Sequence, residues 1–138
     1  MRRPRLVLVP NEPKKAIASE YQECKAFWQY CQCHPMLRDH MIKNVNEGIR
    51  EVWYARALLA TGLRPGLPDY HYPVPNASYH GLWLEFKRSD KRHAKKNPDQ
   101  VLWIERLNKI GHYASYAYGC DDAIEILNSY LANTIKIA

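Results

Sequence analysis

The chain has 138 residues, of which 46% are hydrophobic, and it carries a formal net charge of +6. This composition argues against intrinsic disorder, because so many apolar residues bury enough surface to offset the ordering entropy, and the length fits one domain. The sequence has no apolar run near the roughly 18 residues that span a membrane, and the apolar run near its start is too short for a signal peptide. We therefore expect a cytoplasmic protein with no membrane partner.

The cysteines argue for a reducing compartment. Cys24, Cys31, Cys33 and Cys120 lack the paired spacing of a secreted disulfide framework. Cys31, Cys33 and His34 could be zinc ligands, with Cys24 as a fourth, but their spacing matches no common zinc pattern. Buried thiols are the better interpretation, and a zinc protein ranks last among the alternatives.

The first half of the chain predicts an N-terminal arm (residues 1–18), with a short strand at LVLV, followed by a single domain (residues 19–138). In the sequence SEYQ, Ser19 and Gln22 fit a helix-capping box, and the helix that follows ends at His34-Pro35. The segment DHMIKNV is a candidate strand, and IREVWYARALLATG predicts a helix that Gly62 closes.

The second half predicts a hairpin, a helix, a strand and a last helix. DYHYPV and LWLEFK are extended segments that the loop PNASYHG joins. NPDQVLWIERLNKIG predicts a helix capped by Asn97 and ended by Gly111, HYASYAYG a strand, and CDDAIEILNSYLA a helix. The order of elements indicates an α/β domain with a central mixed β-sheet flanked by helices.

The strand LWLEFK carries the first candidate chemistry. Alternation places Glu85 and Lys87 on one face, so a structural ion pair would explain these two residues alone. Asp69 lies at the start of the strand predicted to pair with this one, and two adjacent carboxylates repel unless a metal ion holds both. Oxygen ligands from Asp69, Glu85 and the carbonyl of Phe86 suit Mg²⁺ or Mn²⁺, which can activate a water for phosphodiester hydrolysis, while Lys87 offsets developing charge.

Positive charge is concentrated directly after this strand. Residues 87–96 contribute +5 of the net +6. Clustered cations indicate a polyanionic partner, most often nucleic acid, although a solvated loop is the usual alternative. The candidate DNA-binding residues are Arg88, Lys91, Arg92, Lys95 and Lys96.

The spacing of these residues resembles a known nuclease superfamily. Pro68-Asp69 followed by Glu85-Phe86-Lys87 resembles the PD-(D/E)XK motif. The sequences GLRPGLPDY, GLWLEFK and DQVLWIERLNKIGH, together with NEG before the second helix, are similar to its VRR-NUC branch, the virus-type replication-repair nuclease domain. The resemblance covers roughly residues 19–131.

The resemblance implies a restriction-endonuclease-like core and Mg²⁺- or Mn²⁺-dependent hydrolysis of DNA. Asp69, Glu85 and the carbonyl of Phe86 would hold the metal, and Lys87 would be the catalytic lysine. Gln100 would support the site or the attacking water. An acidic residue of the first helix often completes such sites, and Glu20 is the candidate, with Glu23 in reserve.

Small members of this branch resemble phage proteins that act as homodimers on branched DNA, as Holliday-junction resolvases do. Two symmetric cuts need two sites related by a two-fold axis. Aromatic residues around Trp53 and Tyr54, or in Tyr113 to Tyr118, could form the interface, although such residues are more often core. The main alternative function is a DNA-binding module whose nuclease-like site is idle.

Overall fold

The computed structural model describes residues 18–44 and 52–133. Most of the expected arm, the strand at LVLV, the NEG sequence and the first residues of the predicted second helix lie outside the described residues. Within the described ranges, no helix is both long enough and apolar enough to cross a membrane.

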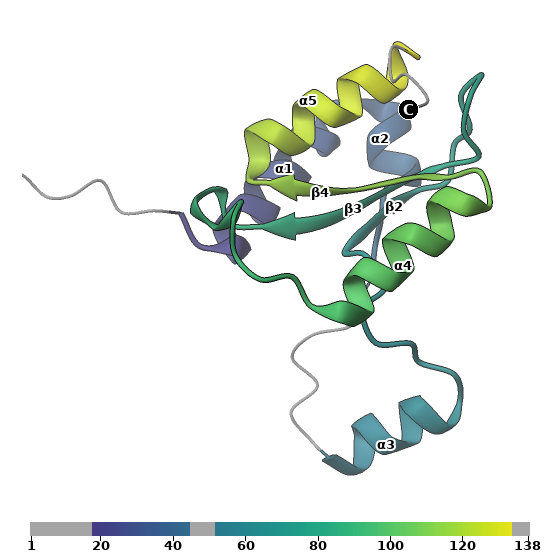
Figure 1. Cartoon of the computed structure of the whole chain (residues 1–138). Coiled ribbons are helices and arrows are strands. Elements are labelled where there is room, and N and C mark those ends of the chain that lie inside the picture. Colours follow the sequence, from purple (N-terminus) through teal and green to yellow (C-terminus); the bar gives the residue numbers. More distant parts are fainter. Residues whose placement is uncertain (1–17, 45–51, 134–138) are drawn as a thin grey trace, which may run out of the picture.

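A four-stranded mixed sheet forms the centre of the molecule (Figure 1). The strands are β1 (Ile42–Lys43), β2 (Tyr70–Tyr72), β3 (Leu82–Lys87) and β4 (Tyr113–Tyr118), in the spatial order β1-β2-β3-β4. The first three pair antiparallel, and β3 pairs with β4 in parallel. The predicted α/β fold with a central mixed sheet is confirmed.

One face of the sheet carries the hydrophobic core under three helices (Figure 1). These helices are α1 (Glu20–Gln32), α2 (Pro35–His40) and α5 (Cys120–Leu131). Leu82, Leu84 and Phe86 of β3 are almost fully buried against them, which confirms the predicted alternation. The predicted capping box at the start of α1 is also confirmed, because Ser19 and Gln22 exchange side-chain and main-chain hydrogen bonds.

The other face of the sheet is covered by α4 (Pro98–Lys109), which connects the parallel strands β3 and β4 (Figure 1). Asn97 caps this helix by accepting a hydrogen bond from the Asp99 N–H at 2.8 Å, and Pro98 occupies its first turn, as the sequence predicts. Trp83, Glu85 and Lys87 point to this face because they alternate with the core residues.

The prediction that the segment DHMIKNV forms a strand is largely wrong. Asp39 and His40 end α2, a short helix that the sequence analysis did not predict, and only Ile42 and Lys43 pair as a strand. Pro35 explains the helix, since its fixed φ suits a first helical position.

Helix α3 (Val52–Ala60) projects away from the sheet (Figure 1). Gly62 follows it with a φ of +106°, the left-handed conformation expected of a residue that closes a helix. None of the described residues of α3 is buried, and Trp53 is 69% exposed. The described part of the chain therefore leaves this apolar helix uncovered.

Candidate active site

Asp69 is held at the point where β2 meets β3. It is only 8% exposed, and its Oδ2 accepts a hydrogen bond from the Phe86 main-chain N–H at 2.8 Å. Lys43 of β1 lies on its other side, with 3.7 Å between Lys43 Nζ and Asp69 Oδ1. The Asn44 N–H donates to the Asp69 carbonyl at 2.7 Å, so the short edge strand fixes the main chain of Asp69 as well.

A close contact with α4 positions the loop that leads to Asp69. Gly66 has a φ of +84°, and a Cβ placed on it would lie 2.6 Å from the Asp99 carbonyl carbon. Only glycine combines this conformation with so close an approach. The loop can therefore lie against the first turn of α4, directly beside Gln100.

Three polar side chains form a connected chain on the α4 side of β3. Lys87 Nζ donates to Gln100 Oε1 at 2.7 Å, and Gln100 Nε2 donates to Glu85 Oε1 at 2.7 Å. Lysine can only donate and an ionised carboxylate can only accept, so the amide has one orientation that satisfies both partners. Glu85 is 1% exposed, and this chain connects its buried carboxylate to the cation that offsets it.

The main chain of Phe86 contributes to the same place. Its N–H points to Asp69, and the N–H and C=O of one strand residue point to the same side of a strand. The Phe86 carbonyl is therefore directed to the β2 side, beyond the end of β2, while the Phe86 side chain is buried in the core.

The two glutamates of α1 occupy different surroundings. Glu20 lines a groove that also includes Asp69, and it lines a second hollow that includes Lys87. Glu23 instead accepts a hydrogen bond from the Cys120 main-chain N–H at the start of α5. The geometry thus brings Glu20, and not Glu23, to the candidate site.

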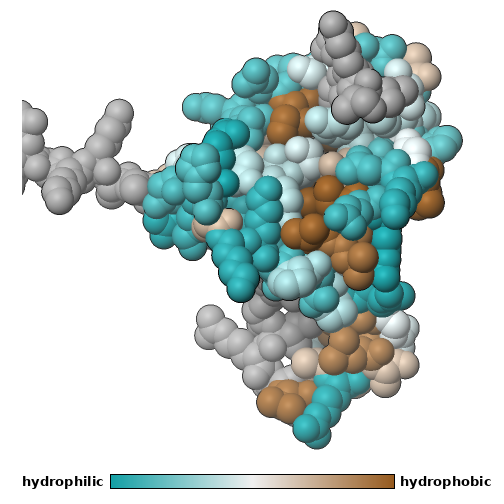
Figure 2. Space-filling view, in the orientation of Figure 1, coloured by the Kyte–Doolittle hydropathy of each residue, from teal (hydrophilic) through white to brown (hydrophobic). Residues whose placement is uncertain are grey.

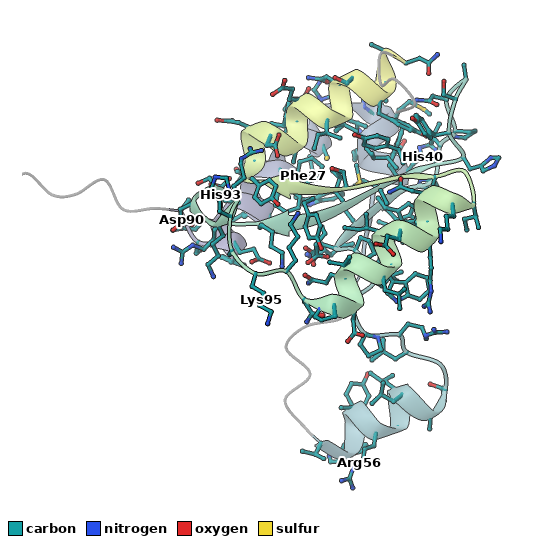
Figure 3. All side chains as sticks on the ribbon, in the orientation of Figure 1. Phe27, His40, Arg56, Asp90, His93 and Lys95 are labelled. Carbon is teal, nitrogen blue, oxygen red and sulfur yellow. The ribbon has the colours of Figure 1, made fainter. Side chains whose placement is uncertain are left out.

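The cations after β3 surround the second hollow, of about 190 Å³, which Lys87, Lys91, Lys95 and Lys96 line. Figure 3 labels Lys95 in the loop between β3 and α4, and Figure 2 shows hydrophilic side chains gathered over this region. The other two predicted cations lie nearby but are partly neutralised. Arg88 pairs with Asp90 at 2.6 Å, and Arg92 lies 4.0 Å from Asp122.

Tyrosines of β4 complete the wall beside these charges. Lys96 Nζ lies 4.4 Å from the centroid of the Tyr116 ring, and the Arg92 guanidinium lies 4.6 Å from that of Tyr118. Burial, and then the neighbouring Glu85, raises the pKa of Tyr116 to about 12. The buried Tyr116 hydroxyl has no hydrogen-bond partner within residues 18–44 and 52–133.

The oxygen donors of the site suit a divalent ion. Two buried carboxylates and a carbonyl directed to the same edge supply oxygen, which hard cations such as Mg²⁺ and Mn²⁺ prefer. Asp69, Glu85 and Phe86 therefore fit such an ion. In the described part of the chain, no group of three or more His, Cys, Asp or Glu side chains is arranged to hold a metal ion.

The alternative zinc ligands point to different surroundings. Cys31 is fully buried in the core, whereas Cys33 is exposed and donates to the Gln29 carbonyl at 3.4 Å. His34 Nδ1 lies 3.1 Å from the Tyr30 carbonyl. Burial raises the pKa of the Cys31 thiol to about 12, so the thiolate that binds zinc is disfavoured.

Lys43 and Asn44 are neighbours of Asp69 that were not predicted from the sequence. Their segment was predicted as a strand, but its pairing partner was not assigned. The feature of the sequence that pointed to them was a segment of alternating apolar and polar residues with a lysine near its end. Only the pairing of β1 with β2 shows that this lysine meets Asp69.

Comparison with known proteins supports the fold. No protein-family model matches the chain, and no curated protein matches it. A solved structure described as a VRR_NUC domain protein superposes with a TM-score of 0.72 at 22% sequence identity, over 85% of this chain and 91% of the other. The chain therefore has the fold of a VRR_NUC domain protein, as the resemblance of its motifs implies.

Proposed function

We propose that the chain is a metal-dependent nuclease that hydrolyses DNA phosphodiester bonds. The observation that carries the proposal is the hydrogen bond from the Phe86 N–H to Asp69, which brings a second buried carboxylate to the strand of Glu85 and Lys87. Nearby cations supply a surface for DNA phosphates. The similarity to a VRR_NUC domain protein supports the same activity.

The residues of this chain have distinct parts in the proposed reaction. Asp69, Glu85 and the Phe86 carbonyl would hold Mg²⁺ or Mn²⁺, which when bound supplies a Lewis acid and an activated water. Lys87 places a positive charge beside the phosphate as negative charge develops there. Gln100 fixes the ammonium group of Lys87 and the carboxylate of Glu85 relative to each other. Glu20 adds a carboxylate from α1 at the same opening.

A cleavage assay tests this proposal. The purified chain should cut a four-way junction or a flap with Mg²⁺ or Mn²⁺, and Asp69→Asn and Glu85→Gln should each lower the rate by about 100-fold or more. Glu105→Gln is the matched control, because Glu105 is exposed on α4. DNA that is bound by the wild type but left intact with either metal would instead support the idle DNA-binding module.

The proposed substrate is branched DNA, and the proposed active form is a homodimer. Support for a second copy comes from α3, on which Val52 is 64%, Trp53 69% and Leu59 50% exposed. The alternative segment, Tyr113–Tyr118, forms β4 and is partly buried between α4 and α5, so it offers less free surface.

Molar mass in solution tests the dimer separately. Light scattering should give twice the chain mass for the wild type and the chain mass for Trp53→Asp. A monomeric wild type that still cuts DNA would remove the dimer and leave the nuclease proposal standing.

A further inference from the structure

An open groove lies beside the candidate active site, between α1 and the strands β1 and β2. Its volume is about 670 Å³, within the range of ligand-binding pockets. Its large apolar lining residues are Tyr21, Trp28, Met41 and Tyr70. Only two of the lining side chains, Asp69 and Glu20, belong to the candidate active site, so most of the groove has no part in the proposed reaction.

The groove combines aromatic rings with cations. Tyr21 is 73% exposed at the start of α1, and Trp28 follows it two turns later on the same side of the helix. Lys25 stands between them on the groove, and Lys43 lies on the opposite wall with its Nζ 4.5 Å from the Tyr70 ring centroid. Aromatic faces and nearby ammonium groups are what proteins use to bind the bases and phosphates of single-stranded nucleic acid.

The groove is continuous with the candidate site. Asp69 lines one end of it, and Glu20 lines both the groove and the hollow formed by Lys87, Lys91, Lys95 and Lys96. A DNA strand whose phosphate reaches Asp69 therefore has cations on one side of the cut and aromatic rings on the other. The bases of an intact duplex are stacked on one another, so their faces are not available to these rings.

We propose that this groove receives an unpaired nucleotide next to the scissile phosphate, with its base against Tyr21 and Trp28 and its phosphate near Lys25 or Lys43. The inference rests on the proposed nuclease function and adds the substrate class. The preferred DNA has an unpaired nucleotide at the cut, as at a bulge, a flap or a branch point.

A binding measurement without divalent metal tests the proposal independently of cleavage. The probe is a short duplex that carries a single bulged 2-aminopurine, compared with the same duplex fully paired. The wild type should bind the bulged DNA more tightly, and stacking should quench the 2-aminopurine fluorescence. Tyr21→Ala should reduce this preference about tenfold, as expected for loss of one base-stacking ring.

Two further variants make the result interpretable. Ile110→Ala is the matched control. Ile110 is a 65% exposed apolar residue at the C-terminal end of α4, which lies on the other face of the sheet from α1, so this variant should leave the preference unchanged. Trp28→Leu keeps an apolar side chain against the core and removes the ring, so it should reduce the preference as Tyr21→Ala does.

The outcomes separate the subsite from the nuclease. Equal affinity for bulged and paired DNA, or a preference that survives both Tyr21→Ala and Trp28→Leu, would overturn the subsite even if both DNAs are cut. A preference for the bulge that both variants remove, with no cut in Mg²⁺ or Mn²⁺, would keep the subsite and sink the nuclease proposal.

Discussion

Two polar clusters lie on the same face of β3, one at each end of the strand. At the start of β3, the Trp83 indole N–H donates to His112 Nδ1 at 3.2 Å, and the His71 ring stacks on Trp83 with 3.7 Å between centroids. At the end of β3, Gln100 links the buried Glu85 to Lys87. Both clusters face the α4 side of the sheet, and both follow from the same alternation of residues in LWLEFK.

The clusters differ in charge. An indole can only donate, so His112 Nδ1 must accept, and the ring is neutral in this arrangement. Burial, and then His112, lowers the pKa of His71 to about 4, which keeps that ring neutral as well. The other cluster gathers Glu85, Asp69 and Lys87 at one strand end. At the start of β3, the partly buried polar groups are neutral rings that pack against one another. At the end of β3, the buried polar groups are charged, and they lie where a phosphate could react.

The largest effect on cleavage is expected from removing the charge of Glu85 at the end of β3. Glu85→Gln should lower cleavage by about 100- to 1,000-fold or more, because a charge that acts on the reacting group is lost. Its unfolding free energy should stay equal or rise, since a buried amide is less costly than a buried carboxylate. Urea unfolding and cleavage rates measure the two effects. Cleavage within tenfold of the wild type would remove Glu85 from the chemistry.

The cations that follow the C-terminal end of β3 should control the affinity for DNA. Replacing Lys91, Arg92, Lys95 and Lys96 by glutamine should weaken DNA binding on the order of 100-fold at low salt. The slope of log affinity against log salt should fall by about one for each DNA phosphate that a cation no longer neutralises. Titrations at several salt concentrations measure both. Unchanged affinity and slope would make residues 91–96 an ordinary solvated loop.

Gln100 should have a smaller effect that shows in both stability and rate. Gln100→Leu removes the link between Glu85 and Lys87 and leaves a buried carboxylate with fewer donors. We expect a loss of about 1–3 kcal/mol of stability and a roughly tenfold lower cleavage rate. Gln100→Glu cannot donate to Glu85, so it should not restore the rate, and full activity in either variant would show that the link is dispensable.

The smallest effect is expected at the neutral end. The pKa of His71 is about 4 when folded and 6.5 in its ordinary state, so the unfolded chain binds more protons between these values. Stability from His71 is therefore present above pH 6.5 and is lost as pH falls toward 4. The loss should be about 1–2 kcal/mol, after allowance for the solvent-facing part of the ring.

His71→Phe should flatten this pH dependence while keeping the stack on Trp83. The exposed His40 on α2 is the control, and His40→Gln should leave the pH dependence unchanged. Unfolding curves at pH 7 and pH 4.5 compare the variants. An equally steep dependence in His71→Phe would mean that other groups, such as His112, carry it.

The sequence predicted the parts of the fold that local patterns determine. The bounds of β3, the caps at Ser19 and Asn97, and the pairing of β2 with β3 were all read from alternation, capping residues and a short loop. The resemblance of motifs then placed Gln100 near Glu85 and Lys87, and the hydrogen bonds between these three side chains agree with it. Their catalytic roles remain predictions.

Features that depend on long-range pairing were not predictable in the same way. The contact of Lys43 with Asp69 arises because β1 pairs with β2 across a long connection. The choice between Glu20 and Glu23 depends on where α5 begins, which the sequence of α1 does not contain. The neutral cluster of His71, Trp83 and His112 combines three separate elements, so no local pattern indicates it.

The hydrogen bond between Glu23 and Cys120 has a consequence for protein synthesis. It ties the first helix of the described domain to the first residue of the last helix, beside Gly119, where a Cβ would lie only 3.3 Å from Glu23 Oε2. A ribosome makes Glu20, Asp69 and Glu85 well before it makes this anchor, and domains fold as units once their segments have emerged. The contact that holds α1 against α5 can therefore form only after α5 has been released.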